Sequence, residues 1–158
     1  MAKGDGAEVV LYKGDQVLLQ KRTRWRKREL GEPPEDMNQP FTFPCHWVLF
    51  GGEVKEGETS EAAVRRELTT ELGPRSLPLT IRLLGTARVL RGDEHRQVYF
   101  YEAPLSCDLS DLALKEGDGF ALFSLEELPH LRMRPEDRLA IERFYGRQGF
   151  GWASVPAP

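Results

Sequence analysis

The chain has 158 residues, of which 40% are hydrophobic and 30% are charged, and its formal net charge is -3. This length is typical of one domain with a real core, and the composition is ordinary for a folded cytosolic protein. Nucleic-acid binding by bulk electrostatics needs a basic excess that this chain lacks, so we expect no stable nucleic-acid partner, although residues 21–28 (KRTRWRKR) form a local basic cluster.

The cysteines and the N-terminus indicate the compartment. Cys45 and Cys107 are too few for a disulfide framework, and neither lies in a metal-ligand pattern. The N-terminal segment MAKGDGAEVVLYKGDQ has no apolar signal region, and no run of the chain is long and apolar enough to cross a bilayer. We therefore expect a cytoplasmic protein with no membrane partner.

The first part of the chain predicts a hairpin, a long loop and a buried strand. Residues 8–12 and 17–21 are β-rich runs joined by a polar turn, which is typical of an antiparallel hairpin. Residues 23–44 contain charges and four prolines without periodicity, and such long loops inside compact domains are commonly functional or mobile. Residues 46–50 (HWVLF) then predict a buried strand that ends at a pair of glycines.

A helix is predicted to begin near Ser60. Thr59 is suited to be its N-cap, and Gly73 with Pro74 is expected to end it. A helical projection gathers three apolar residues into one stripe that must face the sheet, namely Val64, Leu68 and Leu72.

The remaining elements are strands and one further helix. Residues 79–90 and 97–102 are β-rich runs that flank the polar turn RGDEHR, and residues 119–123 predict a last strand. A second amphipathic helix is expected over about 135–145, where proline suits the first position. Strands around one central helix, with another helix near the end, predict an α+β domain with a mixed sheet covered by helices.

Two glutamates of the first helix indicate chemistry. Glu67 and Glu71 lie one turn apart, so their carboxylates meet, and Glu71 falls at the edge of the buried stripe where a merely solvating acid would not point. Two like charges in a half-buried position destabilise each other unless they are neutralised, and Arg66 projects too far round the helix to balance both.

A divalent cation would neutralise these carboxylates better. Mg²⁺ prefers carboxylate and carbonyl oxygens, the turn at Gly51 and Gly52 lets a backbone carbonyl approach, and Glu58 supplies another acid just before the helix. On spacing alone, a solvated surface helix is an equal alternative, because acids four residues apart are common on such helices.

In their order, these residues resemble the Nudix box of the MutT-like hydrolases, G-x5-E-x7-R-E-U-x-E-E-x-G-U, where U is a bulky aliphatic residue. The matching residues are Gly52, Glu58, Arg66, Glu67, Leu68, Glu71 and Gly73. Thr70 stands where the family has a glutamate, and Pro74 replaces the final aliphatic residue. The threonine removes one potential metal ligand, which puts a second or third bound ion in question and could lower activity.

The resemblance implies the Nudix α/β/α sandwich, with a mixed β-sheet and a catalytic loop-helix-loop, in a single domain over residues 1–158. Its core would cover about 7–146, and 149–158 would be a flexible tail. The resemblance also implies hydrolysis, dependent on Mg²⁺ with Mn²⁺ as a substitute, of a nucleoside diphosphate linked to another moiety by attack of water on phosphorus. The substrate would be a modified nucleoside triphosphate, a nucleotide sugar or an ADP-ribose-like compound.

Roles for individual residues follow from the same resemblance. It implies that Glu67, Glu71 and the Gly52 carbonyl bind Mg²⁺, and that Glu67 is alternatively the general base. Arg66 would orient the carboxylates, and Glu58 would hold a further ion or a hydrogen bond. Members of the family often recruit an acid from a later loop, for which Glu116 is the candidate, although an acid in a surface turn is an equal alternative.

Candidate substrate contacts follow the second predicted strand. The basic groups of Arg22 and Arg24 could meet phosphate, and the indole of Trp25 could stack on a base. Arg88, on a later strand, could line the pocket or simply decorate a sheet face. The loop 23–44 could equally form a subunit contact, so a homodimer is compatible with the sequence.

Two other functions compete with catalysis. Thr70 favours a catalytically weak or inactive Nudix domain that binds a nucleotide as a sensor, whereas the retained Glu67 and Glu71 oppose this. An isopentenyl diphosphate isomerase has a related fold, but no arrangement of cysteine and glutamate in this chain clearly supports it.

Overall fold

The computed structural model describes residues 4–22, 46–78, 80–91, 93–114 and 119–147. The strands are β1 Gly6–Lys13, β2 Gln16–Lys21, β3 Trp47–Val48, β4 Phe50–Glu53, β5 Arg82–Arg91, β6 Glu94–Pro104 and β7 Gly119–Phe123. The α-helices are α1 Ser60–Leu72 and α2 Pro135–Arg147, and short 3-10 helices cover Pro74–Ser76, Leu109–Asp111 and Leu128–His130.

The strands form one seven-stranded mixed sheet. Its order is β3-β2-β1-β6-β5, with β4 also pairing with β1 and β7 also pairing with β2. β1 runs parallel to β6, whereas the other pairs are antiparallel. The central strand β1 therefore has neighbours from three separate parts of the chain.

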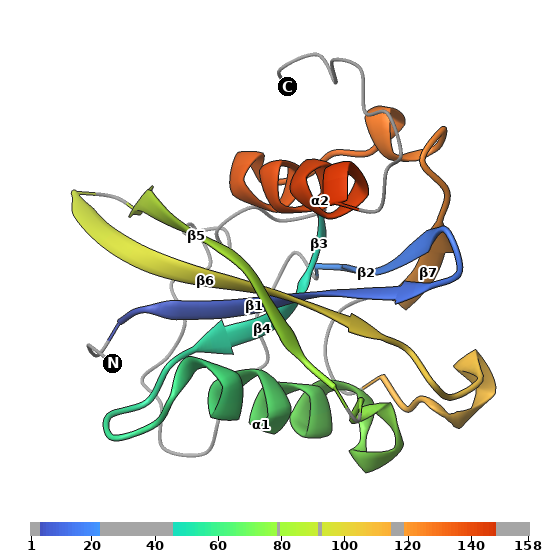
Figure 1. Cartoon of the computed structure of the whole chain (residues 1–158), viewed down its shortest axis with the longest axis horizontal. Coiled ribbons are helices and arrows are strands. Elements are labelled where there is room, and N and C mark those ends of the chain that lie inside the picture. Colours follow the sequence, from blue (N-terminus) through green and yellow to red (C-terminus); the bar gives the residue numbers. More distant parts are fainter. Residues whose placement is uncertain (1–3, 23–45, 79, 92, 115–118, 148–158) are drawn as a thin grey trace, which may run out of the picture.

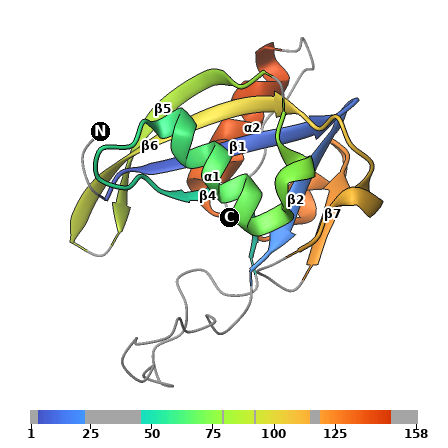
Figure 2. The ribbon, with the colours of Figure 1, turned by 90° about the horizontal axis from the view of Figure 1, so that it is seen from below.

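The two helices cover opposite faces of this sheet, so the fold is an α/β/α sandwich. Figure 1 shows α1 beneath the sheet and α2 above it, and Figure 2 shows α1 running across the lower face. The predicted α+β class with a mixed sheet is confirmed. No helix in the described part of the chain is long and apolar enough to cross a membrane.

Each face of the sheet has its own apolar core. Along β1, Val9 and Leu11 face α1 whereas Val10 faces α2, as the alternation of side chains in a strand requires. The predicted stripe of α1 is fully buried in the first core, together with Phe50. The second core contains the buried apolar residues of α2, namely Ala140, Ile141, Phe144 and Tyr145.

The predicted strand over residues 46–50 is wrong in its extent, because the chain changes partners at Leu49. Trp47 and Val48 pair with β2, whereas Phe50 pairs with Val9 of β1. Between them, the backbone N–H of Leu49 donates to a carboxylate oxygen of Asp137, at 3.3 Å, instead of to a strand. The paired glycines consequently lie inside β4 and do not end a strand.

The polar turn RGDEHR is shorter than the sequence predicts. Pairing between β5 and β6 continues from Arg82↔Glu102 to Arg91↔Glu94, so Glu94, His95 and Arg96 belong to β6. Cross-strand pairing thus extends into residues that are polar enough to look like a loop. The hairpin of β1 and β2, with Leu11 opposite Leu18, agrees with the prediction.

Candidate active site

The loop and helix of the candidate site are held by local hydrogen bonds. The side-chain oxygen of Thr59 accepts from the backbone N–H of Ala62 at 3.1 Å, which caps α1 at its predicted start. At the other end, Gly73 has a φ of 86°, in the left-handed region that glycine adopts without strain. Both ends of the helix are therefore fixed, and the positions of its glutamates are fixed with them.

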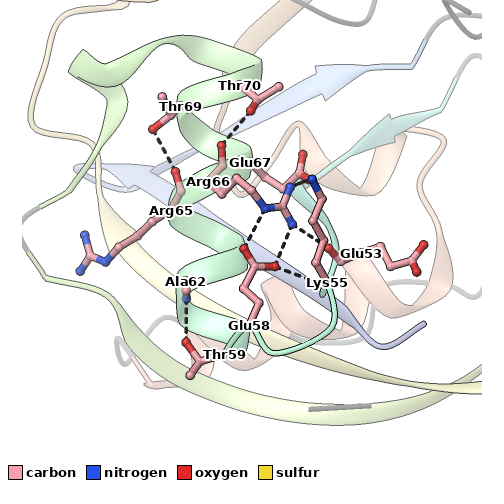
Figure 3. Close-up of polar contacts among 10 residues, drawn as sticks. All are labelled: Glu53, Lys55, Glu58, Thr59, Ala62, Arg65, Arg66, Glu67, Thr69 and Thr70. Carbon is pink, nitrogen blue, oxygen red and sulfur yellow. Dashed lines mark hydrogen bonds and ion pairs between the residues drawn. The ribbon is translucent and has the colours of Figure 1, made fainter. Parts of the chain in front are cut away.

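Arg66 is anchored by the loop that precedes its helix. Its Nε and Nη2 donate to the two carboxylate oxygens of Glu58 at 2.8 and 3.0 Å, and Nη2 also donates to the carbonyl of Glu53 at 2.9 Å (Figure 3). Such a fork-to-fork pair fixes the plane of the guanidinium as well as its position. Hydrogen bonding to Arg66 is the main cause that lowers the pKa of Glu58 to about 2.

Glu67 lies between this guanidinium and the backbone of β4. Nη1 of Arg66 donates to Oε1 of Glu67, in the contact that Figure 3 draws between the two side chains. On the other side, a Cβ added to Gly52 would lie 2.8 Å from Cδ of Glu67. Only a glycine at this position lets the strand pass so close to the carboxylate.

Glu71 is buried against the neighbouring residue of the same strand. Its exposed fraction is 4%, and its Oε2 accepts from the backbone N–H of Gly51 at 3.3 Å. Gly51 has a φ of 146°, and a Cβ there would lie 2.1 Å from the carbonyl oxygen of Ala7. The sequence placed Glu71 at the edge of the buried stripe, and the structure buries it there.

The two carboxylates thus converge on consecutive residues of one strand. Carboxylates beside a backbone free of side chains form a donor set of hard oxygens, which is the kind that Mg²⁺ prefers. The carboxylate of Glu67 reaches the backbone of Gly52, where a Cβ would lie 2.8 Å from its Cδ, so the chemistry of this donor set fits a cation. Among the described residues, no three histidine, cysteine, aspartate or glutamate side chains form a group that could hold a metal ion.

Thr70, which departs from the Nudix box, forms a hydrogen bond within its own helix. Thr70 is exposed, and its hydroxyl donates to the carbonyl of Arg66 at 3.0 Å, as Figure 3 shows. Thr69 does the same with the carbonyl of Arg65, also at 3.0 Å. A threonine in this position therefore satisfies its hydroxyl locally.

The other predicted residues have different places. Arg22 follows β2, and burial is the main cause that lowers its pKa to about 10, with Arg134 acting in the same direction and Glu8, Asp137 and Glu71 against it. Arg22 is therefore within electrostatic reach of Glu71. Arg88 lies exposed on β5, and β1 and β6 separate that strand from β4 in the sheet. The predicted contacts at Arg24, Trp25 and Glu116 fall outside the described residues.

A second group of charged residues, which the sequence did not predict, lies on the α2 side of the sheet. Arg134 donates from Nε and Nη2 to the two oxygens of Asp137 at 2.8 and 3.0 Å, and its Nη2 lies 3.4 Å from Oε1 of Glu8. Burial raises the pKa of Glu8, and Arg134 opposes that rise. The one signal in the sequence is that Glu8 interrupts an otherwise apolar strand.

A family model and a curated protein match parts of this sequence. The family model described as NUDIX domain matches residues 2–144. A nucleoside triphosphatase NudI from Enterobacter sp. (strain 638) is 54% identical over 33 residues, which are 21% of this chain. The matched part spans 23% of the length of that curated relative.

Solved structures resemble the whole fold. The NUDIX domain of Shewanella oneidensis NrtR, complexed with ADP ribose, has a TM-score of 0.68 at 19% identity, covering 94% of this chain and 90% of its own. A MutT NUDIX hydrolase from Burkholderia pseudomallei has a TM-score of 0.65 at 24% identity, covering 87% and 95%. An Ap4A hydrolase from C. elegans has a TM-score of 0.65 at 19% identity, covering 92% and 97%. At these identities, the similarity shows a shared fold and nothing about function.

Proposed function

The chain belongs to the Nudix family, and on that premise we propose that it is a pyrophosphohydrolase. It would cleave a nucleoside diphosphate linked to another moiety, with water attacking one phosphorus. One observation carries this proposal: the carboxylates of Glu67 and Glu71 converge on Gly52 and Gly51, consecutive residues of β4. Phosphoryl transfer mainly requires a protein to position the reacting groups and to neutralise charge, and such a site can do both.

We propose that Mg²⁺ is the cofactor, with Mn²⁺ as a substitute. Glu67, Glu71 and the carbonyl of Gly52 would hold it. A divalent cation at such a site neutralises pyrophosphate charge and lowers the pKa of bound water. Glu58 is hydrogen-bonded to Arg66 through both oxygens, so its proposed role is to hold Arg66, with ligation of a further ion as the alternative.

The protein's own residues then divide the remaining work. Arg66 donates to Oε1 of Glu67 and fixes the direction of that carboxylate, which either binds the cation or accepts the proton of the attacking water. Arg22, which interacts electrostatically with Glu71, would bind a substrate phosphate. Glu116, Arg24 and Trp25 remain sequence predictions for a ligand and for substrate contacts.

A nucleotide-derived substrate is the class we propose. Two of the similar structures are, by their descriptions, a domain complexed with ADP ribose and an Ap4A hydrolase, and both compounds are nucleotides. A third is a dihydroneopterin triphosphate pyrophosphohydrolase from E. coli, with a TM-score of 0.65 at 19% identity, covering 90% of this chain and 94% of its own. A modified nucleoside triphosphate, a nucleotide sugar and an ADP-ribose-like compound are therefore the first substrates to test.

The test is hydrolysis of such a panel with Mg²⁺, with Mn²⁺ and with EDTA, in wild type and Glu71→Gln. Glu61→Gln is the matched control, because Glu61 lies exposed on the same helix and pairs with Arg65 at 3.1 Å. We expect metal-dependent release of a nucleoside monophosphate by wild type and by the control, and none by Glu71→Gln. Full activity of Glu71→Gln would refute the site.

A nucleotide-binding sensor is the second candidate. The hydroxyl of Thr70 occupies the place of a family glutamate and bonds to its own helix, so one potential ligand is missing. Calorimetric binding of a nucleotide by wild type, without turnover of any panel member, would favour this function. A cytoplasmic location and a homodimer remain predictions from the sequence.

A further inference from the structure

A buried ionic group supports the strand that carries the candidate site. Arg134 is 8% exposed, and Asp137, in the first turn of α2, is fully buried. Burial opposes the charge of Arg134, but the carboxylates of Asp137 and Glu8 outweigh it and raise its pKa. A buried charge needs well-placed partners, so the geometry of this group resists displacement.

Asp137 connects this group to the chain just before β4. Its Oδ2 accepts from Nε of Arg134 at 2.8 Å and from the backbone N–H of Leu49 at 3.3 Å. A second hydrogen bond lies two residues before Leu49, where the backbone N–H of Trp47 donates to the carbonyl of Arg132 at 2.8 Å. Hydrogen bonds therefore join the start of α2 and the residues before it to residues 47–49, which precede the paired glycines.

Glu8 connects the same guanidinium to the glycines themselves. It lies opposite Gly51 in the pairing of β1 with β4. Its Oε2 would be 2.9 Å from a Cβ on Gly51, while its Oε1 lies 3.4 Å from Arg134. Gly51 is thus in contact with Glu8 and, through its N–H, with Glu71.

We propose that Arg134 is a positioning residue of the hydrolytic site. Through Asp137 and Glu8 it holds residues 49–52 where the N–H of Gly51 meets Glu71 and the backbone of Gly52 passes Glu67. The inference rests on the proposed function for its effect on turnover. Its effect on the backbone of Gly51 is independent of any substrate or metal.

The primary variant is Arg134→Lys, which keeps the charge but loses the planar guanidinium that contacts the carboxyl groups of Asp137 and Glu8. We expect kcat to fall about 10- to 100-fold, the size that displacement of reacting groups by about 1 Å produces. KM should change less than about twofold, because lysine keeps the positive charge that acts on Arg22, the residue proposed to bind substrate, whereas the hydrolytic carboxylates are displaced. Equal weakening of kcat and of substrate binding would contradict a positioning role.

Arg138→Lys is the matched control. Arg138 is 7% exposed and lies in α2, and it donates to the carbonyls of Leu128 and Leu131 instead of to the sheet. A merely structural loss would lower kcat equally in the two variants. We expect Arg138→Lys to retain kcat within about threefold even if it melts at a lower temperature.

The second readout is hydrogen exchange of the Gly51 amide, followed by NMR without metal or substrate. In Arg134→Lys this amide should exchange at least about tenfold faster, whereas the amide of Leu68 in α1 should be unchanged. This result would support the positioning role even if no substrate were hydrolysed, so failure of the proposed function is distinguishable. An unchanged Gly51 amide would overturn the inference.

A variant that keeps the guanidinium covers the case in which Arg134→Lys does not fold. Glu8→Gln preserves size and still offers an oxygen to Arg134, but it replaces the other carboxyl oxygen by an NH2 group. We expect a loss of kcat of about 3- to 10-fold with faster exchange at Gly51, because an amide presents one oxygen where the carboxyl group presents two. If both kcat and exchange stay at wild-type values in Glu8→Gln, the inference is wrong.

Discussion

Gly52→Ala should separate activity from stability. The new Cβ would lie 2.8 Å from Cδ of Glu67, about 0.6 Å inside the 3.4 Å at which ordinary contact begins. The nearest atoms belong to the end of a flexible side chain, so Glu67 moves and the strand remains. We expect a stability cost near the low end for overpacking, about 1 kcal/mol. The variant should lose about 10- to 100-fold in kcat, because a misplacement of reacting groups by about 1 Å costs up to about 10²-fold.

The assay compares kcat, KM and urea unfolding for Gly52→Ala and a matched control. Gly119→Ala is that control, because Gly119 starts β7 and a Cβ there would meet no atom within 4 Å. Its activity and unfolding midpoint should equal those of wild type. Gly52→Ala with normal kcat would refute the reasoning that the close approach of β4 to Glu67 serves the reaction. A large loss of stability would show that Glu67 cannot yield.

Three further predictions concern α1 and its loop. Glu71→Gln should abolish turnover without unfolding the protein, because an amide oxygen can still accept from Gly51; circular dichroism with an activity assay checks both parts. Arg66 lowers the pKa of Glu58 from 4.5 to about 2, so the stability from this ionised group is complete above 4.5 and is lost as pH falls toward 2. Glu58→Gln should therefore lose stability relative to wild type at pH 7 and much less at pH 2, and an equal difference at both pH values in urea unfolding would contradict this. Thr70→Glu should leave metal affinity unchanged or raise it in a Mn²⁺ titration, and a large loss of activity would show that the threonine has another purpose.

Local patterns in the sequence predicted the loop and helix of the site. A helix period places Val64, Leu68 and Leu72 on the face that packs against the sheet, and the cap at Thr59 and the stop at Gly73 depend on residues within one turn. Because these signals are short-range, the sequence alone located Glu67 and Glu71 correctly on the helix.

Long-range contacts decided what the sequence could not predict. The break at Leu49 depends on Asp137, 88 residues away, and on which strand each neighbour pairs with. Glu8 and Arg134 likewise give at most a weak signal in the sequence, since a single charge in a strand or before a helix is common. Only the packing of α2 over the sheet brings them together behind β4.

In the proposed function, Glu67 and Glu71 serve the attack of water on a nucleotide pyrophosphate. The most direct test is phosphorus NMR of wild type and Glu71→Gln with the substrate panel in ¹⁸O-enriched water. We predict that wild type with Mg²⁺ hydrolyses one phosphoanhydride bond of a panel member, with ¹⁸O on one of the two phosphorus atoms that the bond joined, and that Glu71→Gln does not. Turnover that Glu71→Gln performs equally well, or product phosphorus without ¹⁸O, would contradict the account.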